Sequence, residues 1–476
     1  MIATKSSSPG VVVLGAGSTG LGTGLGLALN GYQRDVLLIE KGARPGGLAG
    51  SYRWKQHTID YGPHRLSPNI PAVRAIAEEL LGPDCLTQKN WHGVQVGGKL
   101  YQFPPRVIDW ITPRSMWHLA SFGASFAWAH LAWIPWRFAP DTFESTLVRK
   151  FGRRFYDVIA ESMADKVWGD PAAIDPSFVN QRFAHVHPWH VLRRFVVPKQ
   201  ELNPSIYYYP RYGYQQLWDN MSDYLEREGQ SVWLSSEPVR IEVEGRRIVR
   251  LVVRTPDGDT EIGGPDLTVV STIPIATLVR LLHGVDSESL ADHVRGINIR
   301  SMLLVAFEFD LPQALPYRNL IYPQRDVCFN RLFEQNQYSR DTVAPGRSVV
   351  IADITYPRGD ARLGKPDADV IEMVRADMAK LSYIPSHRIV DASVRRVEFA
   401  YVTPDLETRR RMYLLQHELK RIANLVLVGR FSAGEYDNAD YAIDNGMTLG
   451  AMISGRISKI DYLCRSHLNR QRYIVG

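Results

Sequence analysis

The chain has 476 residues, 45% of them hydrophobic and 22% charged, which is enough for two to three globular domains without disulfide or metal support. The net charge of +6 is spread without a long basic block, which argues against a nucleic-acid partner and suits anionic small molecules. The three cysteines form no close pair, so we expect a reducing, cytoplasmic compartment. The sequence leaves the oligomeric state open, a homodimer included.

The first elements predict a βαβ unit. Residues 11–14 (VVVL) are typical of a buried parallel strand, residues 18–30 of a helix, and residues 35–40 (DVLLIE) of a second buried strand. The predicted helix carries Gly22, Gly24 and Gly26, which should weaken it, so these glycines imply close packing against another element.

A glycine loop, GAGSTG, joins the first strand to the helix and places Gly15, Gly17 and Gly20 in the G-x-G-x-x-G spacing. The first glycine permits a tight turn, the second lets the backbone approach a pyrophosphate, and the third lets helix and strand pack closely. Glu40 ends the second strand, where a carboxylate can accept hydrogen bonds from ribose hydroxyls and would repel a 2′-phosphate. The unit therefore predicts a dinucleotide site that disfavours NADP.

Two further segments favour FAD over NAD. Residues 41–70 form a long loop with glycines and prolines, and its RPGG stretch offers more backbone donors beside the dinucleotide. A late strand ends in Gly429 and Arg430 and is followed by a helix. A contact from such a distant segment suits the longer flavin cofactor.

The remaining chain mixes helical and antiparallel patterns. We expect helices over 71–82, much of 105–195, 368–382 and 438–461, a hairpin-bearing β segment over 231–272, and strands over 269–275, 300–309, 317–332, 347–356 and 425–430. The strands over 300–309, 317–332 and 347–356 are expected to form an antiparallel sheet.

One stretch needs a membrane test. Residues 115–136 contain no Lys, Arg, Asp or Glu and are rich in Trp, Phe and Ala. Length alone would permit a span, but His, Ser, Gly and Pro dilute the segment. We therefore expect no integral membrane span, and interpret the segment as a buried helix or a lipid-touching face, which leaves peripheral membrane contact open.

Several blocks, in order, resemble the UDP-galactopyranose mutase branch of the FAD-dependent oxidoreductases, which also include protoporphyrinogen oxidase and the amine oxidases. The blocks are GAGSTG with Glu40 and RPGGLAGS, DYGPHRLSP (60–68), ADKVWGDPAAIDPSFVNQRF (164–183), YYPRYGYQQLWDNM (208–221), NRLFEQNQYS (330–339) and VGRFSAGEYDNADYAIDNG (428–446). The similarity runs from about residue 10 to 460.

The resemblance implies an α/β fold with an FAD-binding Rossmann-type domain, a helical insert and a mainly antiparallel β-sheet substrate domain. We expect the FAD-binding domain at 9–72, 195–285 and 390–465, the insert at 73–194, and the substrate domain at 286–389. The implied reaction is pyranose–furanose interconversion of a nucleotide-diphosphate sugar through an adduct at N5 of reduced FAD, with no net redox change.

The resemblance also implies site residues. His64 would lie beside the flavin, and Arg331 and Tyr436 would bind the diphosphate, so these three are the expected catalytic residues. The residues expected to bind the cofactor are Gly15, Gly17, Ser18, Thr19, Gly20, Glu40, Lys41, Arg44, Gly46, Gly47, Leu48, Gly62, Pro63, His64, Gly429, Arg430, Asn438 and Ala439. On the residues alone, Arg331 could instead pair with a carboxylate inside a sheet, and Tyr436 or Trp168 could be core residues.

The chain also departs from the mutase pattern. Gly434 stands where a first tyrosine is expected, Asn438 replaces an aspartate, and Asn330 replaces a threonine. An FAD-dependent oxidase or dehydrogenase acting on a small or apolar substrate is therefore the alternative, since the aromatic side chains of the insert would suit an apolar substrate. A non-catalytic flavin- or NAD-binding module is a third option. No metal-ligand cluster or hydrolase motif is present in the sequence, so no metal is expected.

Overall fold

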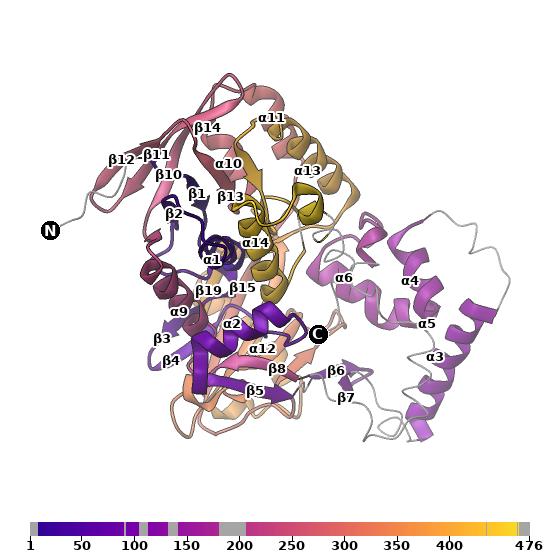
Figure 1. The fold of residues 1–476 in the computed structure, drawn as a ribbon. Coiled ribbons are helices and arrows are strands. Elements are labelled where there is room, and N and C mark those ends of the chain that lie inside the picture. Colours follow the sequence, from indigo (N-terminus) through magenta and orange to yellow (C-terminus); the bar gives the residue numbers. More distant parts are fainter. Residues whose placement is uncertain are drawn as a thin grey trace.

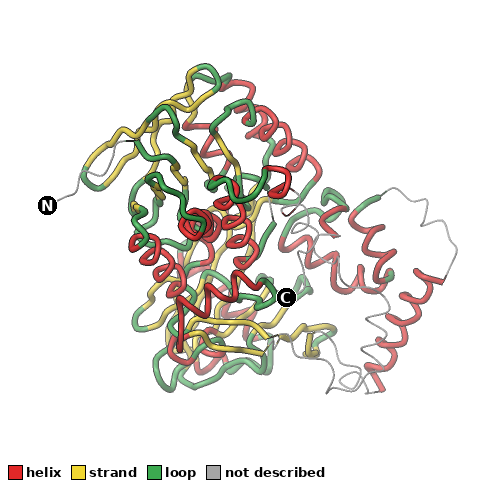
Figure 2. The backbone as a smooth tube through the Cα atoms, in the orientation of Figure 1, coloured by secondary structure: helices red, strands yellow, loops and turns green. Residues whose placement is uncertain are grey.

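The computed structural model describes residues 8–89, 92–103, 113–131, 141–179, 206–434, 436–463 and 465. Two sheets organise them, with a group of helices beyond (Figures 1 and 2). The first sheet is parallel and has the order β20-β13-β1-β2-β9. Its strands are β1 (Val11–Leu14), β2 (Val36–Ile39), β9 (Ser231–Trp233), β13 (Thr268–Ser271) and β20 (Leu425–Leu427). This sheet confirms the predicted Rossmann-type α/β fold.

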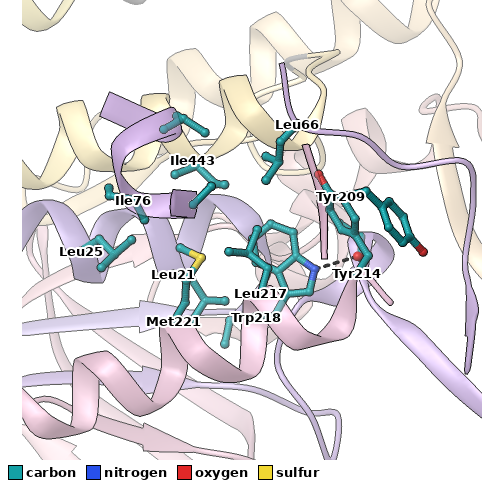
Figure 3. Packing of buried hydrophobic residues seen from close by; sticks show 14 of the residues in the cluster. Leu21, Leu25, Leu66, Ile76, Tyr209, Tyr214, Leu217, Trp218, Met221 and Ile443 are labelled. Carbon is teal, nitrogen blue, oxygen red and sulfur yellow. Dashed lines mark hydrogen bonds between the residues drawn. The ribbon is translucent and has the colours of Figure 1, made fainter. Parts of the chain in front are cut away.

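Both faces of the parallel sheet are buried, which explains the continuous apolar runs of its strands. One face packs against α1 (Ser18–Leu29), α9 (Gln215–Arg227) and α14 (Ala439–Ile453), as Figure 3 shows for Leu21, Trp218 and Ile443. The other face contacts α10 (Ile275–Leu281) and α13 (Leu406–Leu419). α2 (Pro71–Leu81) covers the edge of the first core.

Glycines set the distance between α1 and α14. A Cβ at Gly22 would lie 2.5 Å from the Ile443 carbonyl oxygen, and one at Gly26 would lie 2.3 Å from that of Met447. A Cβ at Gly446 would likewise lie 2.3 Å from the Thr19 carbonyl oxygen. The expectation that the glycines of the first helix serve close packing is confirmed, and the partner is the closing helix.

The second sheet has the order β19-β15-β18-β17-β16-β6-β7, and all its pairings are antiparallel except β16 with β6. Its strands are β6 (His92–Val96), β7 (Lys99–Phe103), β15 (Ile299–Phe309), β16 (Asn319–Ile321), β17 (Arg331–Glu334), β18 (Ser348–Pro357) and β19 (Ile389–Val402). α12 (Asp367–Ala379) packs on its far face. A mainly antiparallel sheet is what we expected.

Sheet membership corrects three details. β19 falls in the range expected for the FAD-binding domain but pairs with β15, and β6 and β7 fall in the range of the helical insert but extend the same sheet. The expected single strand over 317–332 is two strands, because residues 322–330 leave the sheet around Lys166, whose Nζ donates to the carbonyl oxygens of Tyr322, Gln324 and Phe329 at 3.0, 2.9 and 2.6 Å.

Smaller strands complete the fold. The loop expected over 41–70 contains the hairpin β3 (Ser51–Trp54) and β4 (His57–Asp60). The β segment expected over 231–272 forms β10 (Glu237–Glu244), β11 (Arg247–Thr255) and β12 (Gly258–Gly263), with β14 (Leu282–His283) beside β10. β5 (Cys85–Lys89) pairs with β8 (Ile206–Pro210).

The helical part contains α3 (Pro113–Leu131), α4 (Phe143–Phe151), α5 (Arg153–Phe155), a π-helical turn (Tyr156–Ala160) and α6 (Glu161–Val167). Within the residues that the structure describes, no helix is both long and apolar enough to cross a membrane. Residues 132–136 of the uncharged segment lie outside the described residues. α11 (Ser287–Arg295) lies between the two sheets in the chain, and the closing helix ends at Ile453 rather than 461.

Candidate functional site

The glycine loop has the geometry that a dinucleotide requires. Gly15 turns the chain with φ +97°, and a Cβ at Gly20 would lie 1.9 Å from the Gly15 carbonyl oxygen, so this position admits only glycine. A Cβ at Gly17 would meet no atom within 4 Å, so the backbone there faces open space. The amides of Ser18 and Thr19 lie in the first turn of α1, ahead of the Leu21 N–H that donates to the Gly17 carbonyl, and are suited to phosphate oxygens.

Glu40 is held beside this loop by the backbone. Its carboxylate accepts hydrogen bonds from the amides of Ala16 at 2.9 Å and Gly42 at 2.7 Å. Burial raises the pKa of Glu40, and these two hydrogen bonds oppose the rise. A carboxylate with two oxygens keeps free lone pairs for ribose hydroxyls.

The segment after Glu40 closes over the loop. The Gly46 amide donates to the Ala16 carbonyl at 2.8 Å, and Gly46 has φ +107° with Trp218 filling the place of a side chain. A Cβ at Gly47 would meet only the Cα of Gly17, at 3.4 Å. Gly17 and Gly47 therefore border the same open space, which fits a pyrophosphate.

The two basic residues expected at the cofactor are engaged with protein carboxylates. Lys41 Nζ lies 3.1 Å from Glu237, with its side chain 80% exposed, and Arg44 forms an ion pair with Asp219. Their role at the cofactor stays a prediction.

The C-terminal block reaches the same loop. Gly429 has φ +84°, and a Cβ there would lie 2.9 Å from Thr19 Oγ1, so this glycine packs on the first turn of α1. Asn438 precedes α14, which begins at Ala439. The first turns of α1 and α14 thus lie close together, and both helix dipoles favour an anion. Gly17, Gly47, Thr19 and Gly429 therefore lie together around this junction, and the role of the expected residues in binding FAD stays a prediction.

His64 sits between the glycine-loop side and the antiparallel sheet. Gly62 and Pro63 turn the chain before it, and its amide donates to the Gly62 carbonyl at 2.8 Å. The ring Nε2 lies 2.9 Å from the Leu48 carbonyl oxygen, so Nε2 carries the proton. The pKa of His64 is lowered to about 4, mainly by burial and also by nearby Arg430 and Arg331, while the hydrogen bond to the Leu48 carbonyl opposes the shift. His64 is therefore neutral at pH 7, with Nδ1 as an acceptor.

Arg331 is paired inside the sheet. Its Nε donates to Asp353 Oδ2 at 2.7 Å, and its Nη2 contacts the same oxygen. The two residues face each other on β17 and β18, and the nearby Asp353 raises the pKa of Arg331 although burial opposes this. Glu334 does not take part, because it accepts from the amides of Ala314 and Leu315. Arg331 thus has the carboxylate partner that the alternative interpretation anticipated and still lies near His64.

Tyr436 packs against the core of the helical part, to which Trp168 and Phe178 belong, as the alternative interpretation anticipated. Its ring stacks on Tyr401 at 6.3 Å and meets Phe178 edge-on at 5.4 Å, and Phe178 contacts Trp168 at 4.8 Å. The Arg430 guanidinium lies 5.1 Å from the Tyr436 ring centroid. We call Tyr401, Tyr436, Phe178 and Trp168 the aromatic wall.

Arg430 also contacts its own loop. Its Nη2 donates to the Asp437 carbonyl oxygen, and its Nε lies 3.9 Å from Asp437 Oδ1. The structure thus brings His64, Arg331, Arg430 and the aromatic wall together from the N-terminal loop, the sheet, the insert and the C-terminal block.

Sequence reasoning missed several residues here. Tyr401 lies on β19, Asp353 on β18, and His92 on β6, where Arg65 Nη1 lies 3.1 Å from His92 Nε2. Burial, with a smaller contribution from Arg65, lowers the pKa of His92 to about 3, so neutral His92 accepts from Arg65. Arg65 directly follows His64 in the sequence and could have been found there, whereas His92 and Tyr401 carry no local signal.

The described residues contain no group of three or more His, Cys, Asp or Glu side chains that could hold a metal ion.

Comparisons with known proteins agree with this geometry. A family model described as an NAD(P)-binding Rossmann-like domain matches residues 13–80. The structure of a reduced UDP-galactopyranose mutase is similar, with a TM-score of 0.80 and 19% identity over 97% of both chains.

Two oxidase structures also share the fold. A candidate protoporphyrinogen oxidase from Exiguobacterium sp. 255-15 gives a TM-score of 0.69 at 18% identity, covering 95% of this chain and 100% of that one. A putrescine oxidase bound to putrescine gives 0.61 at 15% identity, covering 94% and 99%. No curated protein matches in sequence. The resemblance to the mutase and oxidase group is confirmed, at the level of the fold.

Proposed function

We propose that this chain is an FAD-dependent enzyme that acts on a nucleotide-diphosphate sugar, interconverting its pyranose and furanose forms. The observation that carries the proposal is the convergence of Arg331 and Arg430 with neutral His64 and the aromatic wall, next to a loop that fits a dinucleotide. The whole-chain fold likeness to a UDP-galactopyranose mutase supports it.

The roles of the residues follow from their chemistry. The glycine loop, Glu40 and the first turns of α1 and α14 would hold the FAD, which when reduced supplies a nucleophilic ring nitrogen. Arg331 and Arg430 would bind the diphosphate, since a guanidinium fork matches phosphate oxygens. Asp353 fixes the orientation of Arg331, and the partly exposed rings of Tyr401 and Tyr436 would offer a surface for a sugar or a base. His64 would present Nδ1 as a hydrogen-bond acceptor and would carry no charge.

The second candidate is an FAD-dependent oxidase or dehydrogenase. The aromatic wall favours it, because the partly exposed rings of Tyr401 and Tyr436 would equally contact an apolar substrate from which hydride is removed. The fold likeness to oxidases is compatible with this reaction as well.

The cofactor is tested first. Purified protein should show the two visible absorption bands of a flavin, and heat-released cofactor should have the mass of FAD rather than FMN or NAD. A protein that is colourless, and that stays colourless after FAD is added and the unbound FAD is removed, would contradict both candidates and favour an NAD-binding module.

The diphosphate site is tested by binding of UDP to the flavin-loaded protein, measured by calorimetry. Replacing Arg331 by lysine keeps the charge but loses the fork, and we expect affinity to fall roughly tenfold, equal to one charge-assisted hydrogen bond. The matched control is Arg411→Lys, whose ion pairs with Glu407 and Asp292 lie on exposed helices. Equal affinity in the Arg331 variant and the control would refute the assignment.

A further inference from the structure

The helix α3 exposes two tryptophans on one face. Trp117 is 75% exposed and Trp128 is 64% exposed. Residues eleven apart differ by about 20° around a helix axis and by about 16 Å along it, so the two rings point the same way. Ala120 and Ala124 lie between them and are also exposed. We call these four residues the tryptophan face.

Other residues of α3 contact the protein. The Arg154 amide donates to Ser125 Oγ at 3.0 Å, and His130 Nε2 lies 3.2 Å from the Lys150 carbonyl oxygen. Figure 1 shows α3 at the outer edge of the helical part, with α4 and α5 between it and α6. The tryptophan face therefore points away from the core and from the candidate site.

Charge is arranged around the helix, not on it. Residues 115–131 contain no Lys, Arg, Asp or Glu. The helices α4 and α5, which contact α3, carry four basic side chains and one carboxylate, which leaves a positive excess beside α3. The basic side chains are Arg149, Lys150, Arg153 and Arg154, and the carboxylate is Glu144. Arg149 pairs with Asp141, and Arg153 pairs with Glu144 at 2.6 Å.

We propose that α3 is an interfacial helix that seats this protein on an anionic phospholipid bilayer. Tryptophan rings prefer the headgroup region, where the indole body is apolar and its N–H stays polar. An uncharged helix face flanked by basic residues is the arrangement that lies flat on an anionic membrane.

The size of the face favours a bilayer over a second copy of the chain. A buried tryptophan covers roughly 150–250 Å², so two of them at these exposures offer about 200–350 Å². A stable protein interface needs about 800 Å² on each partner. The tryptophan face is therefore too small to hold a dimer but large enough to anchor a helix in a headgroup layer.

The test is cosedimentation of the flavin-loaded, full-length protein with vesicles. One set contains phosphatidylcholine only, and the other contains phosphatidylcholine and phosphatidylglycerol at 3:1. We expect binding to the anionic vesicles that weakens as salt rises. The double variant Trp117→Ala/Trp128→Ala should lower the partition coefficient at least tenfold. The control Tyr413→Ala removes a ring that is 66% exposed on α13 and should leave binding unchanged.

Three results would overturn the proposal. The first is a double variant that binds vesicles as tightly as the unaltered protein, which would show that the tryptophans do not contribute to binding. The second is an unaltered protein that shows no preference for anionic over neutral vesicles, including one that binds neither. A dimer that dissociates in the double variant, seen by light scattering, would assign the face to a second copy. Equal flavin content and melting temperature in all variants show that folding is not the cause.

Discussion

Replacing Gly17 by alanine should separate dinucleotide binding from folding. The new methyl group would meet no protein atom within 4 Å, and Gly17 has φ −75° and ψ −176°, which alanine adopts without strain. The free energy of unfolding of the cofactor-free protein should therefore change by less than about 1 kcal/mol. The methyl group would occupy the open space that we assign to the pyrophosphate.

The loss of binding can be sized from the hydrogen bonds at stake. Holding the phosphates off the loop removes one or two charge-assisted hydrogen bonds from backbone amides, each contributing about 1.5–3 kcal/mol. The loss of about 1.5–6 kcal/mol means that affinity for FAD should fall roughly ten- to ten-thousandfold.

Gly20→Ala is the matched contrast in the same loop. Its methyl carbon would lie 1.9 Å from the Gly15 carbonyl oxygen, a backbone atom that cannot turn aside. Overpacking of this kind costs about 1–3 kcal/mol, which for a chain of 476 residues lowers the melting temperature by roughly 1–3 °C.

The assay measures melting by circular dichroism on cofactor-free protein and FAD binding by fluorescence quenching. The reasoning predicts that Gly17→Ala loses affinity at an unchanged melting temperature, whereas Gly20→Ala loses stability. If Gly17→Ala keeps its full affinity for FAD, the open space beside Gly17 and Gly47 is not the pyrophosphate site.

Three further variants test the sheet, the histidine and the helix contact. Asp353→Asn leaves the partly buried Arg331 without its carboxylate and should lower the free energy of unfolding by up to about 3 kcal/mol in urea titration, and an unchanged value would mean that solvent already compensates Arg331. Burial lowers the pKa of His64 to about 4, so between pH 6.5 and 4 the unfolded chain binds a proton there that the folded chain does not. The stability due to neutral His64 is therefore complete above pH 6.5 and is lost as pH falls toward 4, and His64→Gln should flatten the melting temperature over this range; equal slopes would place His64 in solvent. Gly26→Ala should lower the melting temperature by a few degrees, because its Cβ would lie 2.3 Å from the Met447 carbonyl oxygen. The control Gly364→Ala meets no atom within 4 Å and should leave the melting temperature unchanged. An unchanged melting temperature in both variants would show that α14 moves aside.

Local patterns account for what the sequence could predict. The first strand, the glycine loop and the first helix follow one another directly, so their spacing alone predicted β1 and α1 to within one residue. The crowding of Gly22 and Gly26 likewise signalled a close helix contact. The identity of the partner, α14, lies more than 400 residues away and has no local signal.

Pairing across the sheet could not be read in this way. Asp353 lies in an apolar run that predicts only a buried strand, and its place opposite Arg331 depends on the register of β17 and β18. β19 was missed because its partly exposed sequence, IVDASVRRVEFAYV, mixes charges with few large apolar residues. Tyr401 reaches the aromatic wall only through that strand.

The central claim is tested most directly by product analysis under oxidised and reduced conditions. Flavin-loaded protein is incubated without oxygen with UDP-galactopyranose or UDP-galactofuranose, with and without dithionite, and the isomers are separated chromatographically. The account predicts interconversion of the two only in the reduced sample, with no net consumption of reductant. It would be contradicted if neither isomer is converted in the reduced sample while an apolar or amine substrate bleaches the oxidised flavin.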